Sequence, residues 1–106
     1  MDCLNRKERT MPAYVIVQEN MHGDQAPFEE YRKHVIATFE PYGGKFLARG
    51  GTVTVLEGAW PSERTVILEF PSRKAAEDWY HSPAYQKILP LRLQCMTSNF
   101  VIMDGV

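Results

Sequence analysis

Residues 64–80 read RTVILEFPSRKAAEDWY, a β-type run that passes directly into a helical pattern. The run RTVILEF is rich in the β-branched and apolar residues typical of a strand, and Pro71 ends it. Ser72 is suited to the N-cap position, and apolar side chains then recur from Ala75 to Tyr80. This stretch predicts a strand over 64–70 that is joined with almost no loop to a short helix.

A second strand and a longer helix precede this stretch. Residues 12–19 (PAYVIVQE) combine adjacent β-branched and aromatic residues, which predicts a strand buried on both faces. From Pro27 to Tyr42, apolar residues recur at spacings of three and four, which is typical of an amphipathic helix. Asp24 is a plausible cap for this helix, and Gly43 follows its expected end.

The remaining segments complete an alternation of strands and helices. Residues 45–49 (KFLAR) predict a strand, and after two glycines the segment 52–58 (TVTVLEG) returns to β-type alternation, with GAWPSER (58–64) closing a hairpin. Ser82 and Pro83 suit the start of another helix that reaches about Leu93. Residues 96–103 (MTSNFVIM) predict the last strand.

The order β-α-β-β-α-β predicts an α+β, ferredoxin-like fold, an antiparallel sheet with its helices on one face. We expect a single domain over 12–106 and a flexible leader over 1–11. Both sheet faces are apolar, since Tyr14 and Ile16 alternate with Val15 and Val17. Helices cover only one face, so we expect the other face to pair with a second copy in a homodimer.

Composition and charge exclude several classes of partner. Twelve Lys and Arg nearly cancel thirteen Asp and Glu, and no basic stripe is present, so nucleic acid is not an expected partner. No apolar run reaches the roughly 20 residues of a membrane helix, and we expect no membrane partner and a cytoplasmic location. Cys3 and Cys95 are both expected to be reduced.

Six motifs together resemble one family. The segments YGGKFLARGG, VLEGAWPSER, VILEFPS, AEDWYHSPAYQ and LPLR, after PAYVIV, are similar to the DUF1330 family of small uncharacterised bacterial proteins. The resemblance covers roughly residues 11–106. It implies membership of the dimeric α/β-barrel superfamily, whose members pair two ferredoxin-like units through their sheets. That superfamily contains cofactor-free monooxygenases, haem-binding enzymes, isomerases and ligand-binding modules, so the fold selects no function.

Glu69 is the first candidate for chemistry. If strands 12–19 and 64–70 are parallel neighbours, Gln18 and Glu69 lie together near their C-terminal ends, and Ser98 approaches from the last strand. A poorly solvated carboxylate is a candidate general acid or base, so Glu69 is a predicted catalytic residue, with Gln18 and Ser98 binding the substrate. The structural alternative is that Glu69 is a solvated charge at a strand end.

Aromatic and basic residues supply further candidates. Trp79 and Tyr80 offer flat walls for a small organic ligand, although both also fit core packing. Tyr85 and Arg92 are not required by capping or by the simplest core pattern, so we predict a catalytic role for Tyr85 and substrate binding for Arg92. Arg49 is a candidate for binding an anionic group; its structural alternative is a salt bridge to Glu57.

No cofactor or metal is expected, because the chain lacks the motifs that hold them. The histidines His22, His34 and His81 are scattered, and neither nucleotide-binding glycine patterns nor a nucleophile elbow is present. Two hypotheses remain open. The chain is either a small-molecule-binding, cofactor-free enzyme that acts on a small aromatic or carboxylated metabolite, or a noncatalytic regulatory module. A cleft filled by Tyr31, Phe39 and Trp79 favours the second.

Overall fold

The computed structural model describes residues 11–106, and the predicted leader lies outside this range apart from Met11. Four strands form one antiparallel sheet in the order β2-β3-β1-β4. They are β1 (Ala13–Met21), β2 (Lys45–Arg49), β3 (Arg64–Phe70) and β4 (Met96–Asp104). The helices are α2 (Ala26–Phe39), α3 (Arg73–Tyr80) and α4 (Pro83–Leu93), and the short 3-10 turn η1 (Glu40–Tyr42) follows α2. The predicted α+β, ferredoxin-like fold is confirmed.

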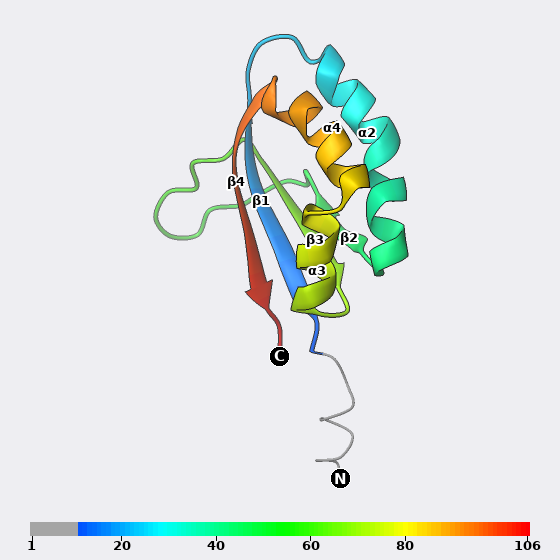
Figure 1. Cartoon of the computed structure of the whole chain (residues 1–106). Coiled ribbons are helices and arrows are strands. Elements are labelled where there is room, and N and C mark those ends of the chain that lie inside the picture. Colours follow the sequence, from blue (N-terminus) through cyan, green and yellow to red (C-terminus); the bar gives the residue numbers. More distant parts are fainter. Residues whose placement is uncertain (1–10) are drawn as a thin grey trace.

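All three α-helices of the described part lie on one side of the sheet (Figure 1). Their starts and ends follow local sequence signals. The Ser72 hydroxyl accepts a hydrogen bond from the Ala75 N–H (3.0 Å), and Ser82 does the same for Tyr85 (3.2 Å), so both predicted caps are present. The Asp24 carboxylate accepts from the Ala26 N–H at the start of α2 (3.0 Å).

Alternation along the strands separates a buried face from an open one. In β1, Ala13, Val15 and Val17 are buried beneath the helices, and the neighbouring strand β3 adds Val66, Leu68 and Phe70 to this core. The opposite surface, which we call the open face, is formed by Tyr14, Ile16, Gln18, Ile67, Glu69, Asn99, Val101 and Met103. It is half-buried or exposed, so the prediction that β1 is buried on both faces is wrong for the single chain.

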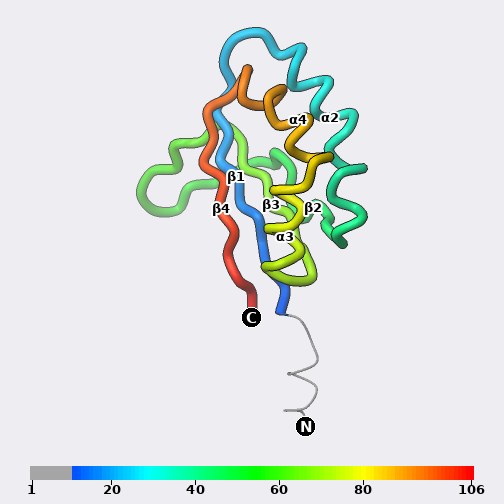
Figure 2. The backbone as a smooth tube through the Cα atoms, in the orientation of Figure 1, coloured from blue at the N-terminus to red at the C-terminus, as the bar shows by residue number. Residues whose placement is uncertain are grey.

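The strand predicted within residues 52–58 is absent. Residues 50–63 form a loop with no strand. At Gly50, directly after β2, the backbone adopts a left-handed φ of 73° and the chain turns away from its partner strand β3. Figure 2 shows this loop standing out on the side of the sheet away from the helices. Its end is fixed to β1, where the Asn20 side chain accepts from the Glu63 N–H (2.8 Å) and donates to the Pro61 carbonyl (3.2 Å).

The predicted parallel pairing of the strands over 12–19 and 64–70 is also wrong. β1 and β3 run antiparallel, with Tyr14 opposite Glu69 and Gln18 opposite Thr65. β3 lies between β1 and β2 and runs antiparallel to both. Gln18 and Glu69 therefore lie near opposite ends of the β1–β3 pair. The expected meeting of these two side chains does not occur.

Two sequence expectations concern cysteine and the membrane. Within residues 11–106, Cys95 is buried and forms no disulfide, and Cys3 lies outside them. Among the helices of that range, none is long and apolar enough to cross a bilayer.

Candidate functional site

A cavity of about 40 Å³ lies between the sheet and the helices. This volume exceeds the ~10–15 Å³ that one water molecule needs. Its walls are largely apolar and come from β1 to β4, α2 and α3: Val17, Phe28, Val35, Phe46, Val66 and Phe100 among others. Its charged lining consists of Glu19, Arg32, Arg49, Arg64 and Arg92. The cavity therefore combines apolar walls with a set of guanidinium groups around one carboxylate.

Glu19 is the buried acid of this cavity. It continues the helix-facing series of β1 and is only 5% exposed. Arg64 Nε lies 3.0 Å from Glu19 Oε1, an ion pair whose angle falls short of a hydrogen bond, so neither buried atom has a hydrogen-bond partner within residues 11–106. Burial raises the pKa of Glu19, and the charges of Arg64 and Arg92 oppose that rise.

Arg92 organises a chain of polar side chains beside Glu19. The guanidinium is buried, donates through Nη1 to the Ser98 hydroxyl (2.8 Å) and through Nε to the Tyr85 hydroxyl (3.3 Å), and lies 5.0 Å from the Phe100 ring centroid. The Tyr85 and Tyr31 hydroxyls are hydrogen-bonded to each other at 2.9 Å. Burial raises the pKa of both phenols, so both keep their protons at neutral pH.

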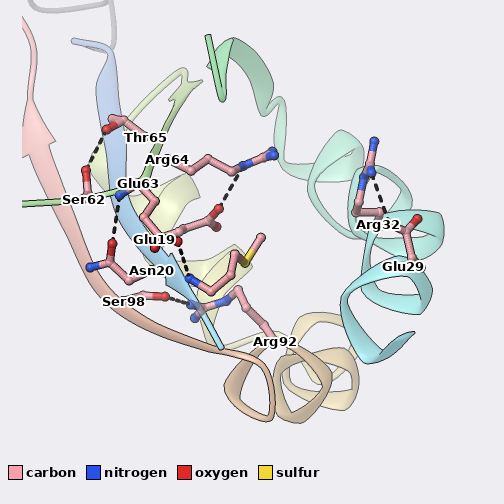
Figure 3. A network of polar contacts seen from close by, with 11 residues as sticks. Glu19, Asn20, Glu29, Arg32, Ser62, Glu63, Arg64, Thr65, Arg92 and Ser98 are labelled. Atoms are coloured by element: carbon pink, nitrogen blue, oxygen red, sulfur yellow. Dashed lines mark hydrogen bonds and ion pairs between the residues drawn. The ribbon is translucent and has the colours of Figure 1, made fainter. Parts of the chain in front are cut away.

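Figure 3 shows Glu19 between Arg64 and Arg92, which approach from β3 and α4, while Ser98 on β4 holds the Arg92 end. Four secondary-structure elements thus supply this one polar cluster, and three of them, β1, β3 and α4, are distant along the chain. Only the folded sheet and helix α4 together produce it.

Two further arginines lie around the cavity. Arg32 is half-exposed and pairs with Glu29 on α2 at 3.6 Å. The Arg49 guanidinium lies 4.4 Å from the Phe46 ring centroid, a cation-π contact. No carboxylate of residues 11–106 forms an ion pair with Arg49, so the alternative salt bridge to Glu57 is absent.

The structure brings several predicted site residues together. Arg49, Arg92 and Trp79 line the cavity, and Tyr85 and Ser98 are bonded to Arg92 behind it. Trp79 is also a core residue, because it is fully buried and its indole N–H donates to the Thr38 hydroxyl (3.0 Å).

Three predicted site residues lie elsewhere. Glu69 is on the open face and pairs with Lys45 at 3.4 Å. Gln18 is on the same face and accepts from the Asn99 amide (3.2 Å). Tyr80 packs against Phe100, with ring centroids 5.2 Å apart, but does not line the cavity. The antiparallel register and the two-residue alternation of strands explain both displaced polar residues.

Sequence reasoning missed Glu19, Arg64 and Tyr31. Glu19 carried a usable signal, because it extends the series Ala13, Val15, Val17 by one more step of two, and a carboxylate on an apolar face needs an explanation. Tyr31 occupies an apolar position of the helix predicted from Pro27 to Tyr42, but nothing in its spacing marks the hydroxyl contact. Arg64, at the start of β3, carried no signal.

No metal site is found among residues 11–106, where no three His, Cys, Asp or Glu side chains are grouped to bind an ion. What the cluster supplies is a proton acceptor at Glu19 with positively charged donors beside it. Such an arrangement accepts a proton from a bound molecule and stabilises the negative charge that develops on it.

The sequence matches a known family, and solved structures share its fold. A family model described as "Domain of unknown function (DUF1330)" matches residues 12–106. No curated protein matches the sequence. Among solved structures, a protein of unknown function from Rhodopseudomonas palustris has a TM-score of 0.74 and 18% identity, over 95% of this chain and 88% of that one.

Two other structures share the fold at lower identity. A hypothetical protein from Arabidopsis thaliana has a TM-score of 0.66 and 14% identity, covering 93% of this chain and 92% of its own. SnoaB from Streptomyces nogalater, a cofactor-independent oxygenase, has a TM-score of 0.61 and 14% identity, covering 92% of this chain and 95% of its own. At these identities the similarity shows the fold alone.

Proposed function

Because the chain belongs to the DUF1330 family, whose description names no reaction, we propose a function that rests on the cavity. The protein is a homodimer that binds a small organic molecule between sheet and helices. It removes a proton from that molecule without a cofactor. The reaction class is proton abstraction from a carbon next to a carbonyl. The C–H electron pair moves into the enolate, and the proton goes to the Glu19 carboxylate.

The observation that carries this proposal is Glu19 itself, a buried carboxylate that lines the cavity and whose one ion pair within residues 11–106 is with Arg64. A carboxylate in a cavity whose pKa is raised by burial is suited to general-base work. Arg92 and Arg64 lie beside it and supply the positive charge that stabilises an enolate oxygen.

The fold gives independent support for chemistry without a cofactor. SnoaB is a cofactor-independent oxygenase on the same architecture. A sheet covered by helices on one face is therefore a scaffold on which an enzyme works without a cofactor.

The homodimer is supported by the open face. Ile16 lies opposite both Ile67 and Val101, which makes an apolar strip across three strands. Val101 and Met103 are each about half exposed, at 52% and 54%. Pairing two such faces removes this apolar surface from water, which is favourable by about 25 cal/mol per Å².

The second candidate function is a noncatalytic regulatory module that binds a ligand or a protein. One observation favours it: Tyr31, Phe39 and Trp79 are buried in the core between sheet and helices. The remaining cavity of about 40 Å³ is far smaller than the ~300–1,000 Å³ of drug-sized ligand pockets. A protein of this kind would bind its ligand or partner protein without catalysing a reaction.

Hydrogen–deuterium exchange decides between the two functions. In D₂O, proton NMR follows the loss of C–H signal next to the carbonyl in a panel of small ketones and 2-oxo acids. We expect catalysed exchange that falls by about 10²-fold or more in Glu19→Gln. Glu69→Gln is the matched control, since Glu69 lies on the open face, and should exchange as the unaltered protein does. Binding without exchange supports the module, and undiminished exchange in Glu19→Gln overturns the role of Glu19.

A further inference from the structure

We infer that the cavity selects small monocarboxylates, with Arg49 and Arg64 binding the carboxylate at its mouth and Glu19 facing the body of the molecule. This inference rests on the proposed function for the location of the site, and it adds the chemical class of ligand. It is carried by the balance of charge around the cavity, by Arg49 and by the cavity's size.

The balance of charge around the cavity is positive. Its lining contains four arginines and one glutamate, so the excess is three positive charges. Glu29, paired with Arg32 at 3.6 Å, reduces that excess to two. Positive charge next to apolar walls attracts an anion, because the walls exclude the water that would otherwise screen it.

Arg49 is the guanidinium best placed to take the anion. Its stacking on Phe46 leaves its donors free, since no described carboxylate pairs with it. Arg64, which also lines the cavity, is one-quarter exposed and lies over Phe28 at 5.5 Å. Guanidinium groups bind carboxylates through paired N–H donors, and ring stacking fixes their planes before a ligand arrives.

The size of the cavity limits the rest of the ligand. About 40 Å³ is the space of roughly three water molecules at ~10–15 Å³ each, which a chain of about three or four heavy atoms fills. Phe28, Val35 and Phe46 make the surrounding wall apolar. A ligand with one carboxylate and a short carbon chain satisfies the charge and the size together.

The test compares butanoate with butanamide, which have the same shape and differ in charge. Titration calorimetry and backbone chemical shifts report binding to the intact protein. We expect butanoate to bind at least 10-fold more tightly than butanamide and to weaken as NaCl is added. Arg49→Gln should reduce butanoate affinity by about 10-fold, whereas Arg73→Gln, which alters a surface arginine on α3, should not. Equal binding of the two probes, no binding of either, or an unaffected Arg49→Gln overturns the inference.

Glu19→Gln separates this inference from the proposed function. Removing the carboxylate takes away negative charge, so the variant should bind butanoate at least as tightly as the unaltered protein while losing proton exchange. Exchange lost with butanoate binding retained supports both claims. Exchange of neutral ketones without selectivity for butanoate retains the proposed reaction and rejects the carboxylate class.

Discussion

Glu19 and Arg92 are two charged residues that the fold takes out of water. Glu19 is 5% exposed and Arg92 is 3% exposed. A buried charge is costly unless it is paired, and Arg92 meets this requirement through Ser98 and Tyr85. Glu19 is ion-paired with Arg64 at 3.0 Å, but the geometry between Oε1 and Nε falls short of a hydrogen bond. The fold thus satisfies the charge of Arg92 more fully than that of Glu19.

The raised pKa of Glu19 makes stability depend on pH. A carboxyl whose pKa is higher in the folded state than its ordinary 4.5 binds its proton more tightly when folded. Its contribution to stability is therefore fully present below 4.5 and is lost as pH rises through the raised pKa. We expect the free energy of unfolding of the unaltered protein, relative to Glu19→Gln, to fall across that window in urea titrations. A difference that rises with pH would show a lowered pKa instead.

The Tyr85 hydroxyl joins Arg92 to Tyr31, so removing it leaves two buried polar groups short of a partner. Tyr85→Phe should lower the free energy of unfolding by about 1–3 kcal/mol, measured by urea denaturation. Tyr80→Phe is the control, because within residues 11–106 the Tyr80 hydroxyl forms no hydrogen bond. Equal effects of the two changes would mean that the hydrogen bonds of the Tyr85 hydroxyl contribute nothing to the free energy of unfolding.

At the scale of elements, the ends of the helices place the site. The Ser82 hydroxyl accepts from the Tyr85 N–H and donates to the Trp79 carbonyl (2.7 Å), which fixes the corner between α3 and α4. Tyr85 and Arg92 both project from α4, so this corner sets their positions over the sheet. The turn after α2 performs the same task for β2, which carries Arg49.

Gly43, in that turn, has a backbone conformation and surroundings that disfavour a side chain. Its φ is 80°, and an added Cβ would lie 2.9 Å from Cδ of Pro71. Gly43→Ala should therefore cost about 1–2 kcal/mol for the left-handed backbone, plus the contact. Gly51→Ala is the control, because a Cβ there meets no atom within 4 Å. Thermal denaturation should show a lower Tm for Gly43→Ala alone; matching Tm values would contradict this account of the turn.

At the scale of the whole molecule, the two sheet faces differ in burial and in the residues that they carry. The helix-covered face holds the core and the polar cluster, and the open face carries exposed apolar residues. The loop 50–63 adds to this exposed surface with Leu56, which is 89% exposed, and with Val53, Val55 and Trp60. A surface of this composition is typical of one that meets a partner.

A charge on the open face tests the homodimer. Val101→Glu places a carboxylate opposite Ile16, and pairing two copies would bury it, so the dimer should dissociate. Light scattering should give twice 12.2 kDa for the unaltered protein and 12.2 kDa for the variant. Leu93→Glu is the control, since Leu93 on α4 is similarly exposed at 57%. A mass of 12.2 kDa for the unaltered protein would reject the homodimer.

Predictions from the sequence were correct where neighbouring residues decide the local structure. The strands, the helices, the caps at Ser72 and Ser82 and the end of α2 depend on periodicity and on backbone geometry within a few residues. The expected strand over 52–58 failed because alternation alone does not form a strand. The segment also needs a neighbour to hydrogen-bond with, and none is adjacent among residues 11–106.

The sequence by itself determined the order of elements, the apolar character of both sheet faces and the family. Only the tertiary structure decided which polar residues meet. The antiparallel register separated Gln18 from Glu69, and the strand alternation sent both to the open face. The packing of α4 on the sheet brought Arg92 to Glu19 across more than seventy residues of sequence. Contacts of this range follow from register and packing, which no local pattern encodes.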